Sequence, residues 1–242
     1  DLVRTGGVAA NWSWWAFLLM GALNVFIYAR LWRRSGVKTD VAFYELRYSG
    51  PMARFLRGFR AVYLGVVFNI LVMAMVTLAA IKIGAVMFGW SPVQTVVIAA
   101  GVTTVYAALG GLRGVVLTDL LQFAFAMVCS VGAAVYVLSL PEIGGLEGLV
   151  SHPNVVGRLH FLPTPGTLGM EFWVPMVLMP LAVQWWASYY PASEPGGGGY
   201  IVQRTLSARN QKEAVLAGLV FNVAHYALRP WPWILVALAS LV

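Results

Sequence analysis

The sequence has little charge and almost no cysteine, and each shortage excludes a class of protein. Only 10% of its 242 residues are charged and 60% are hydrophobic, whereas soluble domains carry about 25% charged and 45–50% apolar residues. The single cysteine, Cys129, lies in an apolar run, so no disulfide framework is possible. With a mean hydropathy of +0.77, the composition predicts an integral membrane protein.

Signatures of enzymes and metal proteins are also absent from the sequence. His152, His160 and His225 lack metal-ligand spacing, and no nucleophile–base pair or phosphate-binding loop is apparent. We therefore expect no catalytic residues and no cofactor. The first residues, DLVRTGGVAANW, do not resemble a signal peptide. The chain ends in ILVALASLV without a polar tail, and we expect it to be a piece of a longer protein.

Long apolar runs predict an all-α membrane domain with six transmembrane spans, because a bilayer-spanning helix needs about 20 mostly apolar residues. The expected spans cover 12–32, 61–90, 92–109, 120–140, 172–203 and 214–242, which we treat as one partial domain covering 1–242. A tight turn at Gly110–Gly114 separates the third span from the fourth.

The basic residues predict the orientation of these spans, because cytoplasmic loops are enriched in Lys and Arg. The inner side holds Arg30, Arg33, Arg34, Lys38, Arg47, Arg54, Arg57, Arg60, Arg113, Arg204, Arg209 and Lys212, whereas the outer side holds only Arg4 and Arg158. The N-terminus is therefore expected outside. The net charge of +7 reflects these loops, so we expect a lipid bilayer and no nucleic acid as the partner of the basic residues.

The fifth span is too long for one helix and contains strong helix breakers. At 1.5 Å per residue, about 32 residues would give ~48 Å against a core of ~30 Å. Pro191, Pro195 and Gly196–Gly199 interrupt it, which predicts a discontinuous helix lining a solute path. In this interpretation Gln203 and Arg204 begin the inner half-helix. The alternative is an extra loop at the membrane interface.

Four aromatic residues precede this interruption and allow two interpretations. Trp185, Trp186, Tyr189 and Tyr190 form either an interfacial aromatic belt or an outer gate and stacking surface for a substrate.

Three motifs resemble the sodium:solute symporter family. They are RRSGVKTDVAFYELRYSG at 33–50, YAALGGLRGVVLTDLLQFAFAMV at 106–128 and YIVQRTLSARNQKEA at 200–214, in the family's order and at suitable spacing. The resemblance implies a LeuT-type fold of two inverted repeats, of which this chain would carry core helices two to seven. Spans 12–32 and 214–242 would then be repeat partners that run in opposite directions.

The resemblance also implies a function, sodium-coupled symport of a small organic solute, in a bacterial inner membrane. The main sodium site would use core helices one and eight, outside this fragment. The alternative is a membrane-embedded enzyme or channel. Two departures stand out. Thr39–Ala42 replaces the usual T-x-P-E, and Trp14 stands where sugar carriers place a glutamate, which argues against a sugar substrate.

Asp119 has two interpretations. It follows Thr118 and precedes an apolar run, so it is either a helix N-cap or, as the resemblance implies, part of a cation or gating site near the cytoplasmic mouth. Gln122 lies one turn later and either shares that site or faces protein.

Arg229 is the most informative charge, because a charge at mid-helix should face a cavity or a partner. Pro230 and Pro232 leave carbonyls that its guanidinium could satisfy. We expect a functional or gating role, with snorkelling as the alternative. His225, one turn earlier, is expected to be a core histidine.

Three further polar residues lie within apolar runs. Lys82 either snorkels to the outer interface or, by resemblance, lies near the substrate path. Asn24 and Asn69 are expected to join helices.

Overall fold

The computed structural model describes residues 2–162, 169–174, 178–182 and 199–242. These residues form helices and connecting turns, with no strand among them, which confirms the all-α fold class. The chain divides into two compact units, Asp1–Arg54 with Cys129–Val242, and Phe55–Val128.

The N-terminal helix of the first unit is a succession of short segments. They are α1 (Leu2–Gly6), η1 (Val8–Asn11), α2 (Trp12–Trp15), α3 (Leu18–Leu23), the π-helical turn η2 (Asn24–Tyr28) and α4 (Ala29–Ser35). Val8–Ser35 is long and apolar enough to cross a membrane. It contains the predicted span 12–32 and ends at Gly36, whose φ of 71° gives the left-handed cap common at helix C-termini.

The C-terminal helix of this unit contains α14 (Gln211–Asn222), the π-helical turn η5 (Val223–Leu228) and α15 (Pro230–Ala239). Asn210 caps its start: the Asn210 Oδ1 accepts from the Glu213 N–H at 2.9 Å, and the Asn210 Nδ2 donates to Glu213 Oε1 at 3.3 Å. The helix therefore begins three residues before the predicted span 214–242, where this cap satisfies the backbone N–H of Glu213.

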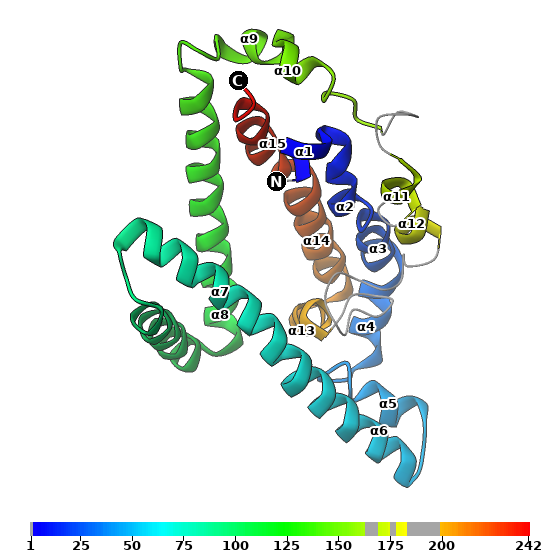
Figure 1. Cartoon of the computed structure of the whole chain (residues 1–242). Coiled ribbons are helices and arrows are strands. Elements are labelled where there is room, and N and C mark those ends of the chain that lie inside the picture. The colour runs from blue at the N-terminus through cyan, green and yellow to red at the C-terminus, as the bar shows by residue number, and fades with distance from the viewer. Residues whose placement is uncertain (1, 163–168, 175–177, 183–198) are drawn as a thin grey trace. The chain divides into compact units, whose positions relative to one another are not determined.

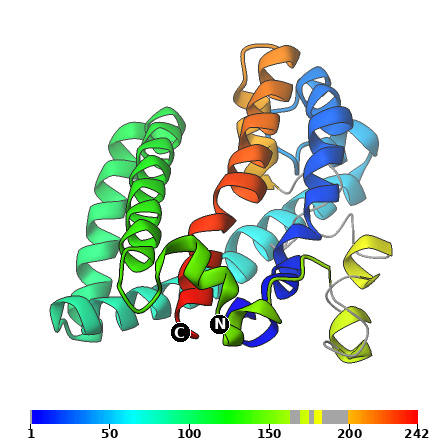
Figure 2. The ribbon, with the colours of Figure 1, turned by 90° about the horizontal axis from the view of Figure 1, so that it is seen from above.

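These two helices lie side by side and run in opposite directions (Figures 1 and 2). As the residue number increases along the N-terminal helix, the number of the residue that it contacts on the C-terminal helix decreases. The pairs are Asn11 with Trp233, Trp14 with His225, Gly21 with Asn222 and Arg33 with Arg209. The predicted opposite directions of spans 12–32 and 214–242 are confirmed.

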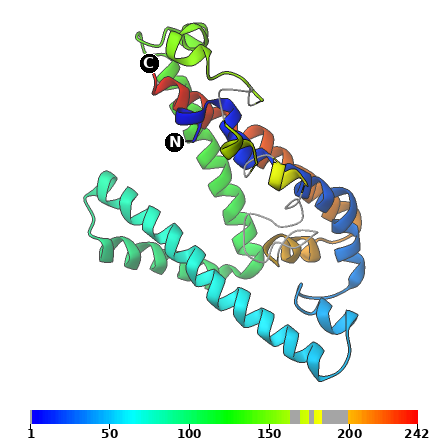
Figure 3. The ribbon, with the colours of Figure 1, turned by 45° about the vertical axis from the view of Figure 1, so that its right-hand side comes forward.

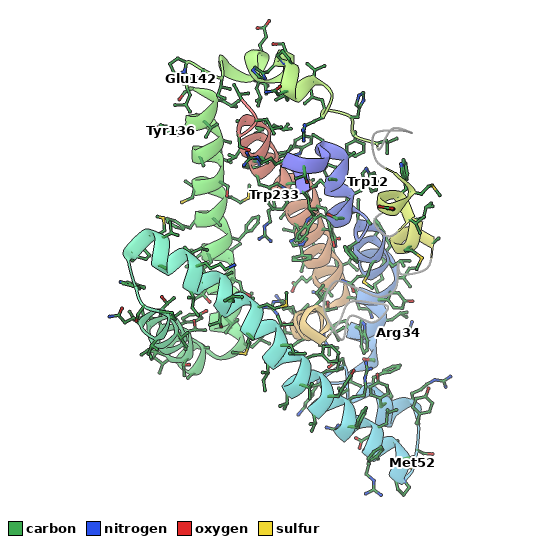
Figure 4. The ribbon with its side chains drawn as sticks, in the orientation of Figure 1. Trp12, Arg34, Met52, Tyr136, Glu142 and Trp233 are labelled. Carbon is green, nitrogen blue, oxygen red and sulfur yellow. The ribbon has the colours of Figure 1, made fainter. Side chains whose placement is uncertain are left out.

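At one end of this antiparallel pair, Arg33 donates to the Arg209 carbonyl oxygen at 3.3 Å. Arg34, on the neighbouring position of α4, is marked in Figure 4. Charge counting assigned the loops that carry Arg33 and Arg209 to one side of the membrane, and the structure places them together.

The opposite end holds the termini and the short helices α9 (Gly145–Ser151) and α10 (Pro153–Val156). The Trp12 indole donates to the Phe161 carbonyl oxygen at 3.0 Å, and the Arg158 guanidinium donates to the carbonyl oxygens of Arg4 and Thr5. The buried core lies at this end and consists of Val3, Val8, Trp15, Ile143, Leu149, Val155, Ile234, Leu238 and Ala239. Arg4 and Arg158, the two basic residues expected outside, are thus neighbours.

The second unit consists mainly of long apolar helices. A continuous helix runs over α6 (Pro51–Val62), η3 (Tyr63–Phe68) and α7 (Asn69–Phe88), and is followed by α8 (Pro92–Leu138), whose last residues belong to the first unit. Both are long and apolar enough to cross a membrane, and their apolar side chains are almost all exposed within this chain. Exposed apolar surface of this extent indicates contact with lipid or further protein.

The helix α8 contains the third and fourth predicted spans, one on each side of Gly111. Gly111 has φ 51° and ψ −160°, a conformation open to glycine but strained for other residues. The ribbon of α8 has one sharp bend along its length (Figures 1 and 3). The interruption lies within the turn predicted at Gly110–Gly114. Helix resumes at once after Gly111, so the predicted tight turn is a single bend at one residue.

Among the described residues, three helices meet the length and hydropathy of a membrane span: Val8–Ser35, Pro51–Phe88 and Pro92–Leu138. The helix over 211–239 is divided at Arg229, and its first part carries Lys212, Glu213 and Asn222. The fifth predicted span is described only in pieces. These are α11 (Met170–Trp173), α12 (Met179–Ala182) and α13 (Gly199–Ser207), and α5 (Phe43–Arg47) lies in the basic loop.

Candidate functional site

Arg229 lies between two indole rings. Its Cζ is 5.8 Å from the centre of the Trp14 ring and 5.7 Å from that of the Trp233 ring. The two rings meet edge to face, with centroids 5.8 Å apart and an interplanar angle of 90°. Both distances lie within the range of a cation–π interaction. Trp233 (Figure 4) comes from α15 and Trp14 from α2, so the antiparallel helix pair builds this site.

The backbone next to Arg229 departs from α-helical hydrogen bonding. In η5 the Arg229 N–H donates to the Ala224 carbonyl at 3.0 Å, five residues back, so it does not bond the His225 carbonyl four residues back. Pro230 has no N–H to donate to the Tyr226 carbonyl. The π-helical turn and the proline therefore leave the carbonyls of His225 and Tyr226 without their usual partners.

Two tryptophans of α2 donate hydrogen bonds to these two carbonyls. The Trp14 indole N–H donates to the His225 oxygen at 3.3 Å, and the Trp15 indole N–H donates to the Tyr226 oxygen at 3.1 Å. The prediction that the Arg229 guanidinium satisfies carbonyls freed by the prolines is therefore wrong for Pro230. Indole donors on the neighbouring helix reach the Tyr226 carbonyl instead, because α2 packs directly against η5.

The third indole of the site is also fixed by a hydrogen bond. Trp233 Nε1 donates to Asn11 Oδ1 at 3.4 Å. Since Asn11 is buried, this bond ties α15 to the start of the N-terminal helix. The rings that flank Arg229 are thus held in place by polar contacts as well as by packing.

His225 packs among aromatic rings, as expected for a core histidine. Its ring lies 4.6 Å from that of Trp14, 4.9 Å from that of Phe221 and 4.9 Å from that of Tyr226. These contacts hold it beside Trp14 on the side of the helix that faces α2.

A close helix crossing lies one to two turns away. A methyl group on Gly21 would overlap the side chain of Asn222, and one on Gly218 would meet Val25 at 3.3 Å and Asn24 Nδ2 at 3.8 Å. Asn222 Nδ2 donates to the carbonyls of Gly218 at 2.8 Å and Gly21 at 3.4 Å. Each helix thus brings a glycine and an asparagine to the crossing. Small residues allow membrane helices to approach this closely.

The two asparagines at this crossing also mark the π-helical turns. η2 begins at Asn24, and η5 begins directly after Asn222. Both side chains are buried, and the Oδ1 atom of each accepts no hydrogen bond in the described part of the chain. Asn24 therefore lies at a helix–helix contact, as predicted, although its carbonyl oxygen is not paired there. Asn69, by contrast, contacts its own helix, with Nδ2 3.6 Å from Met73 Sδ.

Asp119 is not a helix N-cap. It lies inside α8, eight residues beyond the bend at Gly111, and is half-buried. The preceding Thr118 hydroxyl donates to the carbonyls of Gly114 at 3.1 Å and Val115 at 2.9 Å, which is the behaviour of a threonine within a helix. Gln122 is exposed three residues later, on the same face. The N-cap interpretation is excluded because the helix starts well before Asp119.

The inner half-helix begins earlier than predicted. α13 starts at Gly199, so Gly199 is helical and Gln203 lies in the middle of the helix, exposed. A Cβ atom on Gly199 would lie 2.7 Å from Asp40 Oδ2. Asp40 therefore lies beside Gly199, the first described residue of α13. Asp40 belongs to Thr39–Ala42, the segment that differs from the family's usual T-x-P-E.

Lys82 is exposed on α7, six residues before the helix ends at Phe88, and has no ion pair with a described residue. The other predicted substrate-path residues, Trp185, Trp186, Tyr189, Tyr190 and Gly196–Gly198, lie outside the described residues.

Sequence reasoning missed Trp233, Asn222 and Asn11. A signal was present for Trp233, because the sequence RPWPW places it four residues after Arg229, on the same helix face. Asn222 and Asn11 carried no such signal, since a lone amide does not reveal which helix it meets.

Comparison with known families identifies the chain. The model of the sodium:solute symporter family matches residues 2–228, which is nearly its whole length. The chain belongs to the sodium:solute symporter family. Membership makes it part of a multi-pass integral membrane protein from a family of transporters that couple solute movement to sodium. No curated protein matches the chain.

Proposed function

We propose that the chain forms core helices two to seven of a LeuT-type symporter that carries sodium and a small organic solute across a bacterial inner membrane. The six spans would lie at about 12–32, 61–90, 92–109, 120–140, 172–203 and 214–242 in one transmembrane domain, with the N-terminus outside. Sodium is a co-transported ion in this proposal, with its main ligands outside this fragment.

The observation that carries the proposal is the relation between the two antiparallel helices of the first unit. Each contains a π-helical turn that begins at or directly after a buried asparagine, and each asparagine lies close to a glycine of the other helix. Inverted repeats in secondary transporters give pairs of related helices that run in opposite directions. Single π-helical turns are frequent at functional sites.

The proposed solute path passes the face of Arg229 and the interrupted fifth span. Its outer part would include Trp185, Trp186, Tyr189 and Tyr190, and the interruption Gly196–Gly198 would lead to the inner half-helix with Gln203. Lys82 would border the path. Asp119 with Gln122 would form a cation or gating site near the cytoplasmic mouth.

The test is solute accumulation by the intact protein in proteoliposomes. With an inward sodium gradient, one class of solute should rise above its external concentration, and replacement of external sodium by potassium should abolish the accumulation. Accumulation of that solute to the same level without a sodium gradient would contradict the proposal.

A further inference from the structure

Arg229 has a charge without an ionic partner in the described part of the chain. It is exposed there, and among the described residues its guanidinium lies over the indole faces of Trp14 and Trp233. A guanidinium at mid-helix in a membrane protein pairs with an anion, a carbonyl or water. The aromatic faces attract the cation but accept no conventional hydrogen bond, so its donors remain available for another group.

The two backbone oxygens freed beside Arg229 receive hydrogen bonds from indole N–H groups, and in the described residues the Arg229 guanidinium donates to neither. The His225 carbonyl accepts from Trp14 and the Tyr226 carbonyl accepts from Trp15. Trp233 in turn donates to Asn11. The indole N–H groups therefore donate to the backbone carbonyls and to the Asn11 side chain. The N–H donors of the Arg229 guanidinium have no such acceptor among the described residues.

The two rings also orient the guanidinium. Their planes are perpendicular, with an interplanar angle of 90°, so they flank the cation from two directions. Each ring is fixed by its own hydrogen bond, which lowers the entropy lost when a ligand binds. The planar fork of arginine pairs with a carboxylate through two parallel hydrogen bonds.

We propose that Arg229, positioned by Trp14 and Trp233, binds the carboxylate of the transported solute, so that the solute is a small carboxylic acid or amino acid. This inference rests on the proposed function, because it assigns the solute class of that same path. One guanidinium balances one carboxylate, whereas a phosphate carries up to two charges at neutral pH. The surrounding indole surface suits the carbon chain of a small organic acid.

The experiment measures sodium-driven uptake and solute binding by the intact protein. Short monocarboxylates, hydroxy acids and amino acids are each compared with the corresponding primary amide, which keeps size but removes the negative charge. Binding is measured separately, as the increase in thermal stability of the detergent-solubilised protein with each compound.

Four variants separate charge, geometry and folding. Arg229→Gln should raise the KM for the carboxylate about 10- to 100-fold, as expected for loss of a charge-assisted hydrogen-bonded pair. Arg229→Lys keeps the charge without the fork and should recover part of the affinity. Trp233→Phe keeps a ring and should raise KM about threefold, because indole is the better cation–π partner. Arg209→Gln, in a loop at the other end of the helix pair, should leave KM unchanged.

The outcomes show separately whether the carboxylate assignment fails and whether the proposed symport fails. Sodium-driven uptake of amides or sugars with a KM unaffected by Arg229→Gln would overturn the carboxylate assignment and leave symport intact. Carboxylate binding that is lost in Arg229→Gln, without sodium-driven uptake, would support the assignment and overturn symport. Loss of folding in Arg229→Gln would shift the decision to Trp233→Phe, where an unchanged KM for the carboxylate would overturn the assignment.

Discussion

Asn222 packs against Gly21 so closely that no side chain fits between them, and it donates to the Gly21 carbonyl oxygen at 3.4 Å. The contact joins residues 201 positions apart in the sequence. It fixes the crossing of the two antiparallel helices next to both π-helical turns, and it therefore sets the distance between α2 and η5 on which the Trp14–Arg229 site depends.

Gly21→Ala should destabilise the protein, because the added methyl group overlaps Asn222, whose amide is held by the Gly218 carbonyl at 2.8 Å. Overpacking typically costs about 1–3 kcal/mol. The measurement is the unfolding temperature in detergent, with Gly132→Ala as a control because a Cβ atom there meets nothing within 4 Å. In an Asn222→Ala background the penalty of Gly21→Ala should shrink. Equal penalties in the two backgrounds would show that the crossing is not this tight.

Trp15→Phe should destabilise the protein by leaving the Tyr226 carbonyl unpaired. The indole donates to this oxygen at 3.1 Å, and an unpaired buried acceptor costs about 1–3 kcal/mol. Pro230→Ala supplies an N–H four residues after Tyr226, which can take the same oxygen. Trp15→Phe should therefore cost less stability when Pro230 is alanine. Thermal unfolding of both single variants and the double variant measures the coupling, and strictly additive losses would contradict this account of the carbonyl.

Asp119→Asn should raise the sodium concentration needed for half-maximal uptake by about tenfold, equivalent to about 1.4 kcal/mol, with little change in expression. The substitution removes the charge and keeps the size of the side chain. A capping effect is excluded because Asp119 lies inside α8. Glu142→Gln, in the turn after α8, is the matched control. An unchanged sodium dependence in Asp119→Asn would remove Asp119 from the proposed cation site.

Replacement of both Gly197 and Gly198 by alanine should lower uptake while membrane insertion is kept. Alanine favours continuous helix by about 1 kcal/mol per position relative to glycine, and its methyl groups narrow any path that the backbone lines. Gly101→Ala, where a Cβ atom meets nothing within 4 Å, controls for the change in residue type. Normal uptake and solute affinity in the double variant would contradict a path along this segment.

The sequence predicted the helical class and the direction of the paired helices. The length of an apolar run and the positions of Arg and Lys in the loops follow from the bilayer, so they can be interpreted without knowledge of tertiary contacts. The sequence did not predict the contacts of Arg229. A proline shows which carbonyl loses its partner, but the replacement donor comes from Trp15, more than two hundred positions away. The approach of Asp40 to Gly199 was not predicted for the same reason, since the two residues come from distant parts of the chain.

The measurement that tests the central claim most directly is solute-dependent sodium entry into proteoliposomes that contain the intact protein. Symport predicts that radioactive sodium enters faster when the transported solute is present, in a fixed ratio to the solute that enters, because each influx requires the other. Sodium entry at the same rate with and without solute, or solute entry without any accompanying sodium, would contradict it.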